Sequence, residues 1–228
     1  MIKTRFTELF GITSPIVQGG MQHLGIPKFA SLISNAGGMG TINITCYSSP
    51  EEFHEAVREM NALTQKPYIV NISLVPDLTK GDEIFKYIEI CAKEKVAAIE
   101  TAGGDPSQFI PAIKENGIKL IHKTPSAKIA IRMEEKGADV ITIAGYEVAG
   151  HQAPTGSAHL LSPIKWRRYA VFRCWQPGAS PTAEAWRHPW PWARRGSWWV
   201  HALSPPPNAR SRITIRHGSC LTPSGIPH

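Results

Sequence analysis

The sequence predicts an α/β protein of the (β/α)₈ TIM-barrel type, truncated after about six strands and followed by a tail unlike a native domain. Three observations support this. Up to residue 151, short apolar runs rich in Val and Ile alternate with amphipathic stretches of helical length, a pattern typical of βαβ units and a parallel sheet. Six such repeats within residues 1–150 match the pace of a barrel. After residue 151 both periodicities stop.

The six strands are expected at residues 15–18, 39–43, 68–73, 97–101, 119–123 and 140–143. Helix signals lie between them. Ser49, Pro50 and Glu52 form a capping box with proline at the first helical position, and Gly137 follows the last turn of a helix that begins near Ser126. A doubly wound open sheet is the alternative architecture. The predicted domains are a partial barrel over residues 1–151 and a tail over residues 152–228.

The charge of +7 comes entirely from the tail. Residues 1–150 hold fifteen Lys and Arg against seventeen Asp and Glu, net −2, whereas residues 151–228 hold ten against one, net +9. All seven tryptophans lie between Trp166 and Trp199. Basic residues interleaved with aromatics can hold phosphates and stack bases, so a nucleic-acid-binding protein is one competing class.

The composition of the tail is what GC-rich DNA yields when it is translated in the wrong frame. We chose allowed codons for residues 172–203 and joined the third base of each codon to the next two bases. The regrouped text includes A-A-G-G-V-A-D-G-R-G and G-A-E-G-V-L-V-G-T-R-F, two apolar strands that each end in a glycine motif. We therefore interpret residues 152–228 as an out-of-frame segment, expect it to be disordered or poorly folded, and expect no nucleic-acid partner. A native basic domain is the alternative.

The compartment is read from cysteine usage and apolar segments. Four cysteines, Cys46, Cys91, Cys174 and Cys220, have neither the density of a disulfide framework nor metal-ligand spacing. The N-terminus lacks the apolar core of a signal peptide, and no run of about 18 apolar residues exists to span a bilayer. A cytoplasmic protein without membrane contact or bound metal is expected.

Candidate functional residues lie at the ends of the expected strands. The glycines of residues 18–22, QGGMQ, would let a flat ligand or a phosphate approach the backbone. Asn71 lies inside an apolar strand and is either a satisfied core amide or a ligand contact. Lys123 ends the fifth strand and either reaches solvent or faces an anion such as a reduced flavin. His151, directly after Gly150, is either structural or a general base.

Other glycines and polar residues near these strands have simpler interpretations. Gly37, Gly38 and Gly40 lie at the start of the second strand and predict a tight turn between a helix and a strand, with a ligand contact as the alternative. The fourth strand ends in residues 100–106, ETAGGDP.

Taken in order, these strings resemble the nitronate monooxygenase family, formerly called 2-nitropropane dioxygenases. The resemblance rests on PIVQGGMQ at 15–22, NAGGMG at 35–40, Asn71, ETAGGDP at 100–106, IHK at 121–123 and the AGH that ends at His151. It covers residues 1–151. The regrouped tail text looks like the seventh and eighth strands of the same family.

The resemblance implies an FMN-dependent barrel that oxidises alkyl nitronates with O₂ to a carbonyl compound and nitrite. It implies that Gly20, Met21 and Gln22 line the flavin, that Asn71 and Lys123 contact it, and that Gly150 approaches it. His151 matches the family's catalytic histidine, which would deprotonate a neutral nitroalkane. An NAD(P)H:quinone reductase or an enoyl-thioester reductase on the same barrel is the alternative. Because the seventh and eighth strands are lost, we expect weak FMN binding and poor folding.

Overall fold

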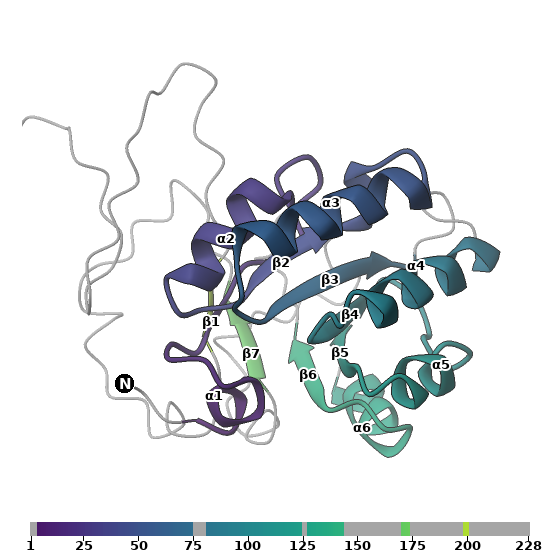
Figure 1. Ribbon diagram of the computed structural model, residues 1–228. Helices are drawn as coiled ribbons and strands as arrows, with labels where there is room; N and C mark the ends of the chain where they lie inside the picture. Colours follow the sequence, from purple (N-terminus) through teal and green to yellow (C-terminus); the bar gives the residue numbers. More distant parts are fainter. Residues whose placement is uncertain (1–3, 75–80, 125–126, 144–169, 174–197, 201–228) are drawn as a thin grey trace, which may run out of the picture.

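The computed structural model describes residues 4–74, 81–124, 127–143, 170–173 and 198–200. Its strands form one parallel, eight-stranded sheet in the order β1-β8-β7-β6-β5-β4-β3-β2. All described helices except the N-terminal one lie on the outside of this curved sheet (Figure 1). The predicted alternation of strands and helices and the parallel sheet are confirmed.

The strands and helices have the following bounds. The strands are β1 Ile16–Val17, β2 Gly40–Asn43, β3 Tyr68–Ser73, β4 Ala98–Ala102, β5 Lys119–Thr124, β6 Val140–Ile143, β7 Ala170–Arg173 and β8 Trp198–Val200. The helices are α1 Arg5–Phe10, α2 Pro27–Asn35, α3 Pro50–Leu63, α4 Gly81–Lys93, α5 Ile110–Glu115 and α6 Ala127–Glu135, with a 3₁₀ turn, η1, at Ile44–Cys46.

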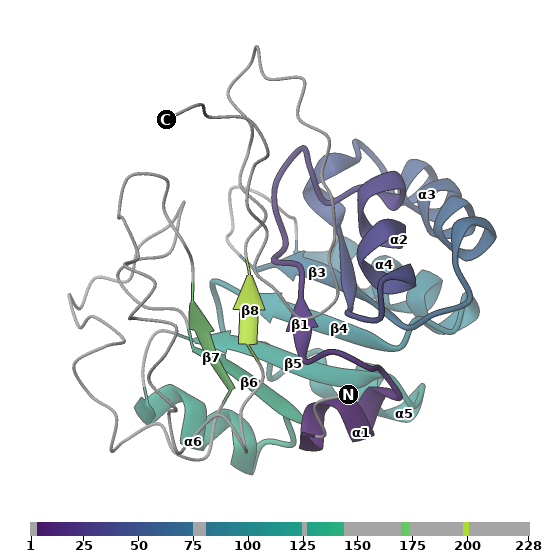
Figure 2. The ribbon, with the colours of Figure 1, turned by 90° about the vertical axis from the view of Figure 1, so that its left-hand side faces the viewer.

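The sheet does not stop after the sixth strand, so the expected truncation is wrong. β7 pairs with β6, and β8 lies between β7 and β1 (Figure 2). Both strands belong to the segment that we expected to be poorly folded. The physical reason is that ladder hydrogen bonds join backbone groups, so short runs of β-branched, aromatic or apolar residues such as AVFR and WWV can extend a sheet.

The seam between β1 and β2 closes the barrel through backbone hydrogen bonds of Met39 to Ile16 and Gln18, extended by a side chain. An isolated parallel bridge joins Val17 to Met39. Beyond it, the Gln18 side-chain amide pairs with the backbone of Thr41: Gln18 Nε2 donates to the carbonyl of Thr41 at 3.1 Å, and the N–H of Thr41 donates to Gln18 Oε1 at 3.2 Å. The Thr41 hydroxyl donates to the carbonyl of Gln18. The amide of Gln18 thus takes the place of a peptide group in the ladder.

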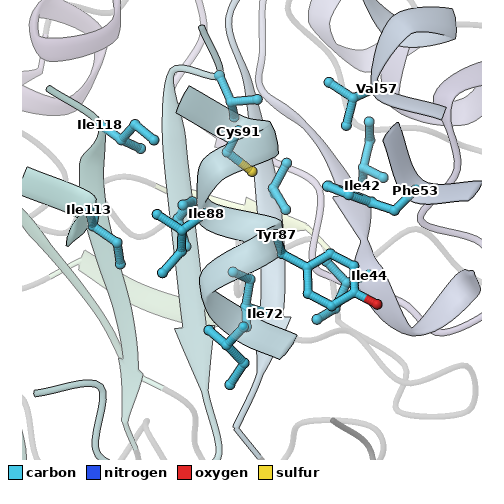
Figure 3. Packing of buried hydrophobic residues seen from close by; sticks show 14 of the residues in the cluster. Ile42, Ile44, Phe53, Val57, Ile72, Tyr87, Ile88, Cys91, Ile113 and Ile118 are labelled. Atoms are coloured by element: carbon cyan, nitrogen blue, oxygen red, sulfur yellow. The ribbon is translucent and has the colours of Figure 1, made fainter. Parts of the chain in front are cut away.

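The two larger apolar cores of the described residues lie on opposite faces of the sheet. The outer core packs helices against strands, and Figure 3 shows Ile88 and Cys91 of α4 among the strand side chains. The inner core lies within the barrel and includes Ile69, Ala98 and Ile121, with Phe6 and Phe10 of α1 packed against it. Because consecutive residues of a strand face opposite sides, this assignment fixes the direction of every neighbouring side chain.

The helix signals read from the sequence are largely confirmed. Pro50 is the first residue of α3, and the Ser49 side chain accepts from the N–H of Glu52 at 3.2 Å. The return bond of the predicted capping box differs, because Glu52 Oε2 accepts from the N–H of Ser48 instead of Ser49. Gly137 follows α6 with φ of +103°, a conformation that glycine adopts without strain.

A polar network on the outside of the barrel joins α3, the end of α4 and β3. His54 Nε2 lies 2.7 Å from Glu94 Oε1, and Asn61 Nδ2 donates to Glu94 Oε2 at 3.1 Å. The Tyr68 hydroxyl donates to Asn61 Oδ1 at 2.9 Å. The hydrogen bond from His54 lowers the pKa of Glu94. Glu94 is therefore a carboxylate that contacts His54 and Asn61 on the helical side of the sheet, in a network that reaches the first residue of β3 and not the carboxyl ends of the strands.

Candidate active site

Three polar side chains face the interior of the barrel near the carboxyl ends of adjacent strands. They are Asn71 on β3, Glu100 on β4 and Lys123 on β5. Each lies two residues beyond an apolar residue of the inner core: Ile69, Ala98 and Ile121. The two-residue period of a strand therefore turns all three inward. In parallel barrels this end carries the functional site.

Glu100 joins the three side chains. Its Oε2 accepts a hydrogen bond from Asn71 Nδ2 at 2.6 Å and lies 3.5 Å from Lys123 Nζ. The Glu100 side chain is 1% exposed and that of Lys123 is 19% exposed. Among the residues that the structure describes, Glu100 Oε1 has no hydrogen-bond partner. A buried ion pair with one unused acceptor therefore lies beside an amide.

Gly20 packs directly against this cluster. A Cβ added at Gly20 would lie 2.4 Å from Cγ and 2.7 Å from Nδ2 of Asn71, closer than non-bonded atoms approach. Sequence reasoning explained this glycine by the approach of a ligand. The structure gives a further reason: the Asn71 side chain occupies the space where a side chain at position 20 would be.

Met21 and Gln22 begin the turn that follows. The Met21 carbonyl accepts from the N–H of Gly25 at 2.8 Å, and the N–H of Asn43 donates to the carbonyl of Gly25 at 2.8 Å. This turn is therefore attached to the end of β2. Met21 is half-buried and Gln22 is exposed.

His122, next to Lys123, faces the opposite side of the sheet. It is buried, and its Nδ1 lies 2.9 Å from Thr101 Oγ1. Burial lowers the pKa of His122 from 6.5 to about 4, because removal from water disfavours the charged ring. His122 is thus neutral near pH 7 and belongs to the barrel wall, while Lys123 belongs to the interior.

Gly150 and His151 lie outside the described residues, so their roles stay predictions. Glu100 was not among the site residues predicted from the sequence, although the segment that contains it, ETAGGDP at residues 100–106, was noted. The signal that could have found it is a carboxylate within the apolar run AAIET of residues 97–101, since a buried acid needs partners.

The described part of the chain brings no group of three or more His, Cys, Asp or Glu together as metal ligands. Among the same residues, no helix combines the length and the apolar character that crossing a bilayer requires.

Comparison with known proteins decides the family. The sequence model named "Nitronate monooxygenase" matches residues 3–165. The chain belongs to this family. The match ends just before Trp166, the first tryptophan of the chain.

Individual relatives of this nitronate monooxygenase family member carry different reaction names. A (3aS,4S,5R,7aS)-5-hydroxy-7a-methyl-1-oxo-octahydro-1H-indene-4-carboxyl-CoA dehydrogenase from Mycobacterium tuberculosis is 31% identical, over 72% of this chain and 44% of the relative. A probable nitronate monooxygenase from Staphylococcus saprophyticus is 28% identical, over 72% of this chain and 55% of the relative. The chain thus spans about half the length of these curated relatives.

A solved structure confirms the barrel class. FabK from Thermotoga maritima is similar with a TM-score of 0.72 and 28% sequence identity, over 88% of this chain and 62% of that chain. The open doubly wound sheet is thereby set aside.

The contact between Gly20 and Asn71 predicts the effect of a methyl group at position 20. We expect Gly20→Ala to lower the free energy of unfolding by about 1–3 kcal/mol, because the added Cβ must displace Asn71. Urea unfolding measures this difference. Gly81→Ala is the control, since nothing lies within 4 Å of its added Cβ. Equal stabilities of the two variants would contradict the contact.

The buried neutral His122 predicts a pH dependence of stability. Its pKa is lower in the folded protein, about 4, than in the unfolded chain, about 6.5. Its contribution is therefore complete above pH 6.5 and is lost as the pH falls from 6.5 to 4, by about 3 kcal/mol at most. His122→Asn should lack this loss. Urea unfolding of both proteins across this range tests it, and parallel pH profiles would refute the assignment.

Proposed function

We propose that this barrel is an FMN-dependent oxidoreductase that uses O₂ to oxidise alkyl nitronates to a carbonyl compound and nitrite. The observation that carries the proposal is the inward cluster of Asn71, Glu100 and Lys123 at the strand ends of a chain of the nitronate monooxygenase family. This buried cluster offers a cation, an amide and a carboxylate oxygen without a partner among the described residues. These groups can bind a polar ring system that becomes negatively charged.

The residues of this cluster fit a flavin. Lys123 offers a cation for the negative charge of the reduced ring, and Asn71 offers an amide group. The unpartnered Glu100 Oε1 can accept from a ring N–H. Gly20, Met21 and Gln22 would pass along one side, with Gly150 near the ring. FMN, when bound, supplies the electron transfer between the nitronate and O₂.

His151 is the proposed general base. An imidazole titrates near neutral pH and can remove the proton α to a nitro group. A nitronate is already deprotonated and does not need this step. The role of His151 therefore distinguishes the neutral nitroalkane from its nitronate.

The second candidate is a reductase on the same scaffold, acting on a quinone with NAD(P)H or on an enoyl thioester. The observation in its favour is the relative whose name specifies a carboxyl-CoA dehydrogenase. Nitronate-dependent O₂ uptake supports the first candidate, and anaerobic, quinone-dependent consumption of NADH supports the second.

The sequence of the tail lowers the FMN affinity that we expect for this chain. Barrels of this class often hold a cofactor phosphate with backbone N–H groups after the seventh and eighth strands. We propose that the segment expected to be out of frame, residues 152–228, lacks these motifs beyond residue 165, where the family match ends. Resequencing the gene across codons 145–175 tests this at the DNA level, since one extra or missing base must lie there.

The lost motifs predict a difference in FMN affinity. A chain restored to the family's reading frame should bind FMN at least about tenfold more tightly than the present chain, because a single charge-assisted contact to phosphate is worth about 1.5–3 kcal/mol. Quenching of flavin fluorescence gives both dissociation constants. Stoichiometric, equally tight binding by the present chain would refute the proposal.

The role of His151 predicts a substrate-dependent defect. In the FMN-loaded protein, His151→Ala should lower kcat/KM for a neutral nitroalkane roughly a hundredfold or more, the usual contribution of a general base. It should change kcat/KM for the preformed nitronate much less. Nitrite release from both substrates measures the ratio. Equal losses for both would rule out His151 as the base.

A further inference from the structure

Glu100 holds a position that stability alone does not explain. Among the described residues, Glu100 is the one acidic residue that is buried. A buried ion pair contributes little to stability, because the charges lose their hydration. One oxygen, Oε1, also has no partner among those residues, which adds to the cost of burial. A buried charge with an incomplete set of partners is more typical of a functional site.

We propose that Glu100 is a positioning residue, which holds the Lys123 ammonium group and the Asn71 amide in a fixed relation at the interior end of β3, β4 and β5. The proposal rests on the flavin site proposed above, because it assigns a role within that site. Glu100 would affect flavin binding through Lys123 and Asn71 and not through its own contact with the flavin.

The contacts of a single oxygen carry the inference. Both donors converge on Glu100 Oε2, Asn71 Nδ2 at 2.6 Å and Lys123 Nζ at 3.5 Å. Asn71 and Glu100 are partners in the register of β3 and β4, whereas Lys123 pairs with Ala102, two residues further along β4. The lysine side chain therefore reaches back toward the barrel interior to meet the carboxylate.

Each donor has a freedom that Glu100 removes. A lysine carries a point charge on a flexible stem with several rotatable bonds, and a carboxylate partner restricts where that charge lies. An asparagine amide can present either its oxygen or its nitrogen in one direction, and an acceptor at Oε2 selects the nitrogen. Gly20 limits the amide from the other side, since its backbone leaves no space there.

Two other roles for Glu100 predict different results. If Glu100 only stabilises the fold, its replacement lowers stability and leaves the FMN affinity of the folded protein unchanged. If it acts only as a negative charge, its neutralisation tightens binding of anionic FMN. If it positions Lys123 and Asn71, its neutralisation weakens FMN binding.

The first experiment measures FMN affinity in the full chain. Glu100→Gln keeps the shape and removes the charge, and we expect the dissociation constant for FMN to rise about tenfold, as for partners that orient ligand-binding groups. Glu94→Gln is the matched control, because Glu94 also holds two donors but lies outside the barrel. We expect it to leave the dissociation constant within about twofold.

The outcomes separate this proposal from the proposed function. Absence of FMN binding by the wild-type chain and by the frame-restored chain would overturn the flavin site itself. Wild-type binding with an equal or lower dissociation constant in Glu100→Gln would overturn only the role of Glu100.

A second experiment needs no cofactor. We expect limiting acetylation of the apoprotein, read by mass spectrometry, to modify Lys123 several-fold faster in Glu100→Gln than in the wild type or in Glu94→Gln, because the Lys123 amine loses its carboxylate partner. Glu100→Asp keeps the charge but is one methylene shorter, so it should release Lys123 as well and serves if Glu100→Gln does not fold. An unchanged rate at Lys123 in a folded variant would overturn the proposal.

Discussion

The alternation of inward and outward residues along each strand governs the whole barrel. On β3, Val70 and Ile72 face the helices, while Ile69 and Asn71 face the interior. Because the strands are parallel, the same alternation turns Glu100, the register partner of Asn71, to the interior face. Lys123 faces the same side from the level of Ala102 and reaches back to Glu100. A shift of one residue in any strand would turn these groups into the apolar layer beneath the helices. Fold and site therefore depend on one register.

This alternation also separates two neighbouring residues that look alike in the sequence. His122 and Lys123 both lie near the end of β5, and both have side-chain nitrogens that can carry a proton. His122 faces the barrel wall and stays neutral, whereas Lys123 faces the interior and meets a carboxylate. The chemistry of the strand end is thus restricted to every second residue.

The sequence reveals those features that depend on short segments. The six strands up to residue 143 and the start of α3 at Pro50 were predicted within a residue or two, because their patterns are local. The contact between Asn71 and Glu100 joins residues that are 29 positions apart. Neither segment contains a local pattern that predicts the contact with the other. The same holds for Gly20 and Asn71. The continuation of the sheet through β7 and β8 was not predicted, because strand pairing joins backbone groups and requires no particular side-chain pattern.

The side chain of Gln18 has a consequence for the path of the main chain after β1. Its amide pairs with the N–H and carbonyl of Thr41 in place of a peptide group, so the main chain after Gln18 can leave the ladder. The loop that follows can begin within the depth of the strands instead of above their rim. Gly20 reaches Asn71 by this route. One amide side chain thereby allows the main chain at Gly20 to approach Asn71 on the interior face of the sheet.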